Sequence, residues 1–257
     1  MRARILLAVL MLSILLPCRP GAAQSLKIYG TESPPLSFHG DAGVDGMLVE
    51  LTHEVQRRLG DHEPVEILPW SRAKMLADHA PNVLLLSVLR TPERERELRF
   101  VGPVMVSRVA VLAVHSRAAE LRARDPELHG LRTGVRRSSV TTAMAHEAGF
   151  NVTDEISTSD NGARMLMLGR FDLWFESEEL ANGALQAAGY KPGDVEVMAR
   201  LTPQPVYFAF SLGTPETVIQ AWSAALHDMK RDGSFQRIHR KWLQGYEMPP
   251  DAQPGGK

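Results

Sequence analysis

The chain has 257 residues, of which 44% are hydrophobic and 23% charged, with 29 basic and 30 acidic side chains. This balance leaves no excess of basic charge for nucleic acid or an anionic membrane surface, so we expect neither as a partner. Cys18 is the single cysteine, which excludes a disulfide within the chain and a cysteine-based metal site.

The first 23 residues predict a signal peptide. Arg2 and Arg4 precede an apolar run over residues 5–16. A run of about a dozen residues is shorter than the ~20 that a membrane-spanning helix requires, which disfavours an N-terminal anchor. Small residues at 21–23 favour cleavage after Ala23, with Gln24 as the mature N-terminus.

Lipoprotein processing at Cys18 is an alternative, but Pro17 stands where a lipoprotein signal has a small residue. Cleavage after Ala23 removes three arginines and no acid. The 29 basic residues then become 26 against 30 acidic ones, a formal charge of −4. We expect a periplasmic protein that acts as a monomer.

The mature chain begins with an alternation of strands and helices. Apolar runs of strand length are separated by stretches with helical spacing of apolar residues, and Gly60 marks the end of the first helix. Within about sixty residues we expect strands at 26–30, 65–67 and 83–88, and helices at 48–59 and 71–79. Such alternation is typical of parallel strands joined by right-handed crossovers.

A second alternation follows. We expect strands at 109–114, 132–135, 173–175, 195–198 and 206–211, and helices at 138–148, 161–168, 178–188, 215–232 and 234–244. Two consecutive α/β units indicate two lobes with a ligand cleft between them. Lobe 1 is expected at 26–109 and 207–246, lobe 2 at 110–206, and a flexible tail at 247–257, with hinges near Val109 and Val206.

Catalytic and metal-binding motifs are weak or missing. Ser71 and Lys74 have a Ser-x-x-Lys spacing, which is short enough to arise by chance and has no Lys-Thr-Gly partner motif. The nine histidines show no zinc-binding spacing, and no phosphate-binding glycine loop is present. We therefore predict no catalytic residue, no metal and no cofactor.

Several arginines follow the apolar strand that ends near residue 88. Thr91, Pro92 and Glu93 form a helix start, with Thr91 as N-cap. A guanidinium donates two parallel hydrogen bonds to a carboxylate, so Arg90 and Arg94 are candidates for ligand binding. A solvated helix face explains them equally well on spacing alone.

This segment resembles the signature of the family-3 periplasmic solute-binding proteins, the amino-acid-binding receptors of ABC importers. Further resemblances occur in the same order over essentially the whole mature chain. They are Pro-Trp-Ser-Arg-Ala at 69–73, Gly-Val-Arg-Arg-Ser-Ser at 134–139, Gly-Arg-Phe-Asp at 169–172, and Asp-Gly-Ser-Phe at 232–235 followed by Lys-Trp-Leu at 241–243.

The resemblance implies a type II periplasmic-binding-protein fold that closes around a small ligand and delivers it to the membrane subunits of an ABC importer. It implies that Arg94, three residues after Thr91, holds a ligand carboxylate and that Ser87 faces the ligand. In the second lobe, Ser138 and Ser139 precede a helix whose first backbone N–H groups are free to meet an anion. The alternative is that Ser138 is only an N-cap.

Two departures from the family pattern concern the ligand. Ser138 replaces the usual glycine of its turn. In that family an acidic side chain binds the amino group of the ligand, and the resemblance aligns its position with Ser177. Glu176 or Glu178 would provide this acid only if the alignment shifted by one residue. If neither does, the ligand is not an α-amino acid.

Three other side chains are candidates at the cleft. Glu32 stands near an acid position of the first lobe, and Trp70 and Trp174 are able to stack on the ligand or to fill the core. Two further functions stay open. One is a periplasmic enzyme of the cyclohexadienyl dehydratase type with Glu176 or Glu178 as general acid, and the other is a ligand-sensing module for a membrane receptor.

Overall fold

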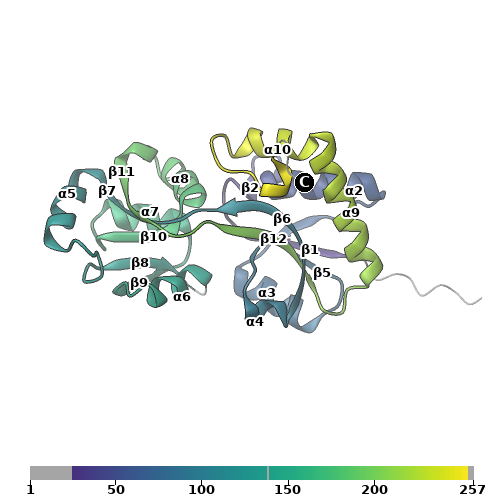
Figure 1. The fold of residues 1–257 in the computed structure, drawn as a ribbon, viewed down its shortest axis with the longest axis horizontal. Helices are drawn as coiled ribbons and strands as arrows, with labels where there is room; N and C mark the ends of the chain where they lie inside the picture. Colours follow the sequence, from purple (N-terminus) through teal and green to yellow (C-terminus); the bar gives the residue numbers. More distant parts are fainter. Residues whose placement is uncertain (1–24, 138, 254–257) are drawn as a thin grey trace, which may run out of the picture.

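The computed structural model describes residues 25–137 and 139–253. Two lobes lie side by side, and two long strands run between them (Figure 1). The expected signal peptide with Cys18 lies outside the described residues, and so does Ser138.

The first lobe contains a five-stranded sheet in the order β4-β1-β5-β12-β6. Its strands are β1 (Lys27–Gly30), β4 (Val65–Ile67), β5 (Val83–Leu89), β6 (Leu98–Ser107) and β12 (Gln204–Ser211). β1 is parallel to β4 and β5, as the alternation predicts, and β12 is antiparallel to both β5 and β6. A small hairpin of β2 (Phe38–Gly40) and β3 (Gly43–Asp45) lies after β1.

Helices cover both faces of this sheet. Those on one face are α2 (Met47–Leu59), α9 (Glu216–Asp232) and α10 (Ser234–Trp242), and those on the other are α3 (Trp70–His79) and the short α4 (Pro92–Glu95). The larger core lies under the first group and includes Trp222, Phe208 and Phe210, all nearly inaccessible to solvent. Gly60 ends α2 in the left-handed conformation, with φ 71°, that glycine adopts without strain.

The second lobe contains a five-stranded sheet in the order β11-β7-β10-β8-β9. Its strands are β7 (Val109–Val114), β8 (Thr133–Arg136), β9 (Val152–Ile156), β10 (Leu173–Ser177) and β11 (Val195–Arg200). The helices are α5 (His115–Arg124), α6 (Val140–Glu147), α7 (Ser159–Met167) and α8 (Glu178–Ala187), with a 3₁₀ turn η1 (Pro192–Asp194). β10 is parallel to β8, so both strands end at the same edge of the sheet.

The chain crosses between the lobes twice. The first crossing is at Arg108, between β6 and β7, and the second is at residues 201–203, between β11 and β12. The second crossing is earlier than the expected hinge near Val206, because β12 already pairs with β6 from Gln204 onward.

Residues 247–253 differ from the expected flexible tail. A 3₁₀ turn η2 (Pro250–Ala252) lies on the first lobe, and Ala252 is buried in its core. Gln236 Nε2 donates to the Ala252 carbonyl at 2.9 Å, and Lys230 pairs with Asp251 at 2.6 Å. These contacts order the segment.

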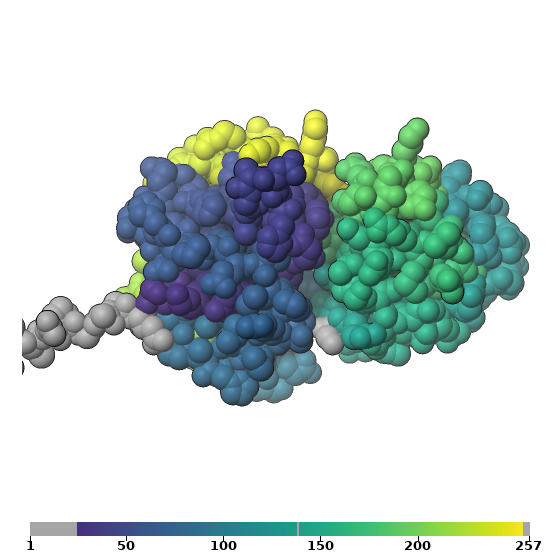
Figure 2. Space-filling model, turned by 180° about the vertical axis from the view of Figure 1, so that it is seen from behind, coloured from purple at the N-terminus to yellow at the C-terminus, as the bar shows by residue number. Residues whose placement is uncertain are grey.

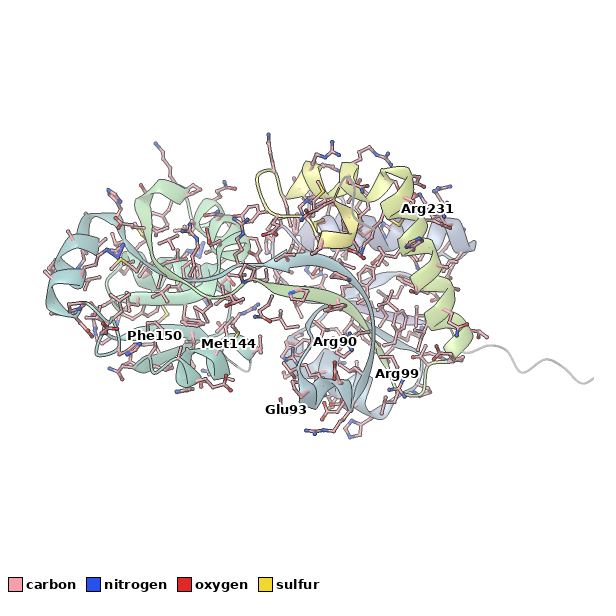
Figure 3. All side chains as sticks on the ribbon, in the orientation of Figure 1. Arg90, Glu93, Arg99, Met144, Phe150 and Arg231 are labelled. Atoms are coloured by element: carbon pink, nitrogen blue, oxygen red, sulfur yellow. The ribbon has the colours of Figure 1, made fainter. Side chains whose placement is uncertain are left out.

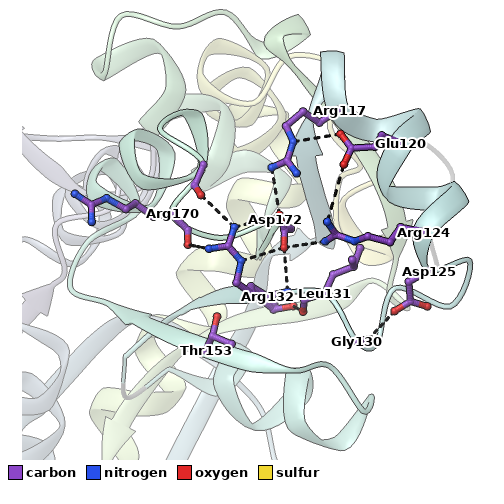
Figure 4. A network of polar contacts seen from close by, with 12 residues as sticks. Arg117, Glu120, Arg124, Asp125, Gly130, Leu131, Arg132, Thr153, Arg170 and Asp172 are labelled. Carbon is purple, nitrogen blue, oxygen red and sulfur yellow. Dashed lines mark hydrogen bonds and ion pairs between the residues drawn. The ribbon is translucent and has the colours of Figure 1, made fainter.

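A buried acid, Asp172, lies directly before β10 at the centre of a network of ion pairs (Figure 4). Asp172, only 4% exposed, pairs with Arg117, Arg124 and Arg132 at N–O distances of 3.1–3.2 Å. Burial alone would raise the pKa of Asp172, but hydrogen bonds and charge from Arg132 and charge from Arg124 lower it. The Asp of the Gly-Arg-x-Asp motif therefore has a structural role here.

No helix among the described residues combines the length and the apolar character that crossing a membrane requires.

Candidate ligand-binding cleft

A cleft of about 680 Å³ lies between the lobes. The hollow is visible in Figure 2 between the first lobe, in purple, blue and yellow, and the second, in teal and green. Its walls come from the carboxyl ends of β1, β4 and β5 in the first lobe and of β8 and β10 in the second. This is where open α/β sheets collect ligands, because the loops that leave the strands converge there.

Arg94 lies in this cleft, on the first lobe. The predicted helix start is present: Arg94 N donates to Thr91 Oγ1 at 3.3 Å, and Pro92 occupies the first helical position. The guanidinium donates from Nη1 to the Leu89 carbonyl at 3.0 Å and lies 5.1 Å from the centre of the Trp70 ring. Burial lowers the pKa of Arg94.

Arg94 makes no ion pair with any carboxylate of the described residues, whereas Arg90 pairs with Glu95. Ser87 and Trp70 line the same wall of the cleft, and Trp70 is half-buried. The structure therefore brings together three of the residues that the sequence singled out in the first lobe.

Arg90 requires a correction, because its side chain does not line the cleft. It is exposed, donates from Nε to Glu95 Oε1 at 2.5 Å, and lies 5.7–5.8 Å from the ring centres of Phe100 and Tyr207. Figure 3 places Arg90 and Glu93 in the first lobe, and Met144 and Phe150 in the second. Thr91 begins a new turn immediately after Arg90, so Arg90 and Arg94 point in different directions.

Glu32 lies at the rim of the cleft, where its Oε2 pairs with His39 Nδ1 at 2.8 Å and its Oε1 accepts from His39 N at 3.3 Å. Ser139 lines the opposite wall, but its hydroxyl is occupied. Ser139 Oγ donates to the Arg136 carbonyl at 2.6 Å and lies 2.6 Å from Thr141 Oγ1. Helix α6 begins at Val140, two residues later than expected, so Ser139 rather than Ser138 occupies the N-cap position.

Glu176 lies at the base of the second-lobe wall and is fully buried. Its Oε2 accepts from Ser159 Oγ at 2.9 Å and its Oε1 from Ser177 N at 3.0 Å, and Arg136 Nε is 3.5 Å away. Two alternatives from the sequence lie elsewhere. Glu178 pairs with Arg200 at 2.7 Å outside the cleft, and Trp174 is buried in the core.

Glu179 was not predicted, yet it lines the cleft and is 2% exposed. Ser107 Oγ donates to its Oε1 at 2.5 Å, and Arg108 N donates to its Oε2 at 3.4 Å. Both donors belong to the first crossing between the lobes. Burial raises the pKa of Glu179 to about 7, so the carboxyl is partly protonated near neutral pH.

Arg136 and Ser177 also line the cleft, at the ends of the paired strands β8 and β10. The sequence analysis assigned no function to Arg136, although it is part of the Gly-Val-Arg-Arg motif. Its position directly after a predicted buried strand could have indicated that it lines the cleft. The sequence alone does not indicate that Glu179 lines the cleft, because the direction of its side chain depends on the residue at which β10 ends and α8 begins.

Among the described residues, no group of three His, Cys, Asp or Glu side chains is placed to hold a metal ion. The cleft therefore offers three arginines, three glutamates, hydroxyl groups and apolar surface. This composition suits a small polar molecule held by hydrogen bonds and charge.

Known proteins share this architecture. The chain is 27% identical over 221 residues to the L-cystine-binding protein TcyA of Bacillus subtilis (strain 168), covering 83% of this chain and 80% of TcyA. A histidine kinase sensor domain with similarity to periplasmic binding proteins superposes with a TM-score of 0.76 at 20% identity, covering 87% of this chain and 98% of that domain. A substrate-binding protein of an ABC uptake transporter from Streptococcus pneumoniae, solved with bound histidine, superposes with a TM-score of 0.75 at 19% identity, covering 87% and 94%.

The two structural likenesses establish the fold, which is that of the periplasmic binding proteins. The family model for bacterial extracellular solute-binding proteins, family 3, matches residues 27–245, which include both sheets and the cleft. The motifs, the two-lobed fold and this match agree, and the chain belongs to family 3 of the bacterial extracellular solute-binding proteins.

Proposed function

We propose that this protein captures a small carboxylate-bearing ligand, an amino acid or a similar compound, by closing its two lobes and delivers it to an ABC importer. Family membership supports capture rather than catalysis. TcyA binds an amino acid, and the Streptococcus pneumoniae protein serves an ABC uptake transporter with histidine bound, which supports the ligand class and the partner.

The observation that carries the proposal is the state of Arg94. It is a half-buried cation that faces the cleft and makes no ion pair among the described residues. The Leu89 carbonyl accepts from only one of the Arg94 nitrogens, and a ligand carboxylate would add two parallel hydrogen bonds and an opposite charge. The Trp70 ring, whose centre lies 5.1 Å from the guanidinium carbon, adds a cation–π contact that supports the position of this cation in the cleft.

Calorimetry on Arg94 variants tests this with a ligand identified by native mass spectrometry of the purified protein. Removing one member of a buried charge pair typically costs ~2–5 kcal/mol, so Arg94→Ala is expected to weaken binding by ~30-fold or more. Arg94→Lys restores only part, because an ammonium lacks the planar two-point contact. Arg96→Ala, an exposed control on the same segment, changes the binding free energy by less than ~1 kcal/mol. Equal affinities for Arg94→Ala and wild type contradict the proposal.

The site of action follows from the family and from the N-terminal pattern. An extracellular solute-binding protein works outside the cytoplasmic membrane, and we infer that the chain reaches the periplasm through cleavage after Ala23. We infer that the lobes move relative to each other at the two crossings, Arg108 and residues 201–203.

One observation favours a second candidate, the dehydratase type of enzyme. Glu179 lines the cleft and its raised pKa keeps a proton available near pH 7, which a general acid requires. This replaces Glu176 and Glu178 in that role, because Glu176 is already ion-paired and Glu178 lies outside the cleft. Incubation with a cyclohexadienyl carboxylate distinguishes the two functions, since only the enzyme generates an aromatic product with its ultraviolet absorbance.

A further inference from the structure

A row of apolar side chains lies in the first-lobe part of the cleft. Leu89 at the end of β5, Val206 on β12 and Met105 on β6 all line the cleft. Val206 is the register partner of Leu89 on one side and of Met105 on the other. Residues directly opposite each other on antiparallel strands point to the same face of the sheet, so these three side chains form one row across it.

The apolar surface extends beyond the sheet. Leu36, between β1 and β2, and Leu180, on α8 of the second lobe, also line the cleft. Both belong to the same hydrophobic cluster as Met105 and Val206, and Leu89 packs against that cluster. These five residues are called the apolar floor below. It joins the two lobes, because Leu180 comes from the second.

Arg94 lies at one end of the row. Its Nη1 donates to the carbonyl of Leu89, the first residue of the row, at 3.0 Å. Neighbouring strands are about 4.8 Å apart, so the row extends about 10 Å from β5 across β12 to β6. A ligand whose carboxylate pairs with Arg94 therefore has apolar surface beside it, over a length that suits a branched aliphatic or an aromatic side group.

The carboxyls of the cleft already have protein partners. Glu32 pairs with His39 at 2.8 Å, at the rim. Glu176 and Glu179 accept hydrogen bonds from serine hydroxyl groups, and Arg136 lies 3.5 Å from Glu176. A cationic side group on the ligand has to compete with these partners for a carboxylate, whereas an apolar side group gains by leaving water for the apolar floor.

We propose that the apolar floor binds an aliphatic or aromatic side group of the ligand, which is then a carboxylate with an apolar side group and no charge at that end. This rests on the proposed function, in which Arg94 holds the carboxylate. Because the floor includes Leu180 of the second lobe, the side group contacts both lobes and favours their closed arrangement.

Calorimetry with two matched pairs of acids tests the floor. L-norleucine and L-lysine have the same carbon chain and differ in the terminal ammonium of lysine. Hexanoate and 6-aminohexanoate differ in the same way and lack the α-amino group. We expect binding in at least one pair, with the apolar member at least ~10-fold tighter, because the ammonium loses its water without an unoccupied carboxylate to replace it.

Variants assign this preference to the floor. Leu89→Asn and Val206→Thr each replace an apolar side chain by a polar one of similar size. Each is expected to reduce the preference for the apolar member at least ~3-fold, with no loss of affinity for the ammonium-bearing member. Leu212→Asn, exposed directly after β12 and outside the cleft, is the matched control and leaves the preference intact. Melting curves identify any variant that fails to fold, and the wild-type comparison stands without the variants.

Two kinds of result overturn the inference, and they are distinguishable. If the ammonium-bearing member binds as tightly as the apolar one or more tightly, or if no member of either pair binds at millimolar concentration, the apolar floor is not the binding surface. The carboxylate-binding function then still depends on the Arg94 variants. If n-pentylamine binds as tightly as norleucine, or hexanol as tightly as hexanoate, Arg94 holds no carboxylate and the proposed function fails as well.

Discussion

The carboxyl group of Glu179 provides a direct test of the structure through the pH dependence of stability. It is almost completely buried, and its two hydrogen-bond donors are Ser107 Oγ and Arg108 N at the first crossing between the lobes. Burial raises its pKa from 4.5 to about 7. Between these values the folded protein binds a proton that the unfolded chain releases.

The sign of the effect follows from this proton balance. Stability from a raised carboxyl pKa is fully present below pH 4.5, falls as the pH rises, and is lost above about pH 7. A shift from 4.5 to about 7 corresponds to about 3 kcal/mol at 1.36 kcal/mol per unit, taken as an order of magnitude. Ligand-free wild-type protein should therefore lose about this much stability between pH 5 and pH 8 from Glu179.

Glu179→Gln removes the titration while keeping the shape of a protonated carboxyl. The amide oxygen replaces the acceptor for Arg108 N, and the amide N–H₂ donates to Ser107 Oγ, which accepts after rotation of its hydroxyl. We expect the variant to match wild type at pH 5 and to exceed its free energy of unfolding by about 3 kcal/mol at pH 8. Urea unfolding followed by circular dichroism at several pH values measures both.

Taking the difference between variant and wild type cancels the other titrating groups. Glu178→Gln is the neighbouring control, because Glu178 lies outside the cleft in an ion pair with Arg200, and it should keep the wild-type pH dependence. A constant difference between Glu179→Gln and wild type from pH 5 to pH 8 would falsify the assignment of this pH dependence to Glu179.

Two further predictions concern closure and the distal ion-pair network. Small-angle scattering should show a smaller radius of gyration when ligand is added, because the ligand contacts both walls and favours the closed state; an unchanged radius at saturation excludes closure. Asp172→Asn should lower the free energy of unfolding by about 3 kcal/mol, the lower end for a broken buried ion pair, because its arginine partners are a third to a half exposed. Its ligand affinity by calorimetry should stay at the wild-type value, since Asp172 and the cleft lie at opposite ends of β10, and a large loss of affinity contradicts this separation.

The sequence predicted the alternation of strands and helices because most elements have clear apolar periodicity and recognisable ends. Some elements lacked these signals, among them the hairpin strands β2 and β3 as well as β6, β9 and α5. Gly102 and Pro103 interrupt the apolar pattern of β6, and β9 buries only Ile156 among its five residues. Helix α5 buries only Ala118 and Leu121, so its sequence resembles a polar loop. Weak patterns of this kind become regular structure only through tertiary pairing.

The candidate site was predictable where local chemistry determines geometry. The N-cap at Thr91 and the proline after it fix the turn that directs Arg94 into the cleft. At the end of β10 the sequence has four polar residues in succession, and the point at which the strand becomes helix decides which of them line the cleft. Element boundaries are uncertain by one or two residues from sequence alone, so Glu179 and Ser177 could not be separated from Glu178.

Helix α8 carries both Glu179 and Gly183, and Gly183 packs against the first lobe. A substitution at Gly183 therefore tests whether the pKa of Glu179 depends on how closely the two lobes pack. A Cβ at Gly183 would lie 2.6 Å from the Pro34 carbonyl oxygen and 3.1 Å from its carbon, both backbone atoms of the first lobe. Gly183→Ala must therefore move α8 or the Pro34 segment, at a cost of about 1–3 kcal/mol.

Glu179 is one turn before Gly183 on α8, so a shift of the helix loosens its contacts with Ser107 and Arg108 and admits water. Its pKa should then fall toward 4.5, and the loss of stability between pH 5 and pH 8 should shrink to less than half of the wild-type value. Gly193→Ala adds the same methyl group in open space and should leave the pH dependence unchanged. If Gly183→Ala destabilises the protein but retains the full pH dependence, the Pro34 segment rather than α8 has moved. The pKa of Glu179 then does not depend on how closely the lobes pack at Gly183.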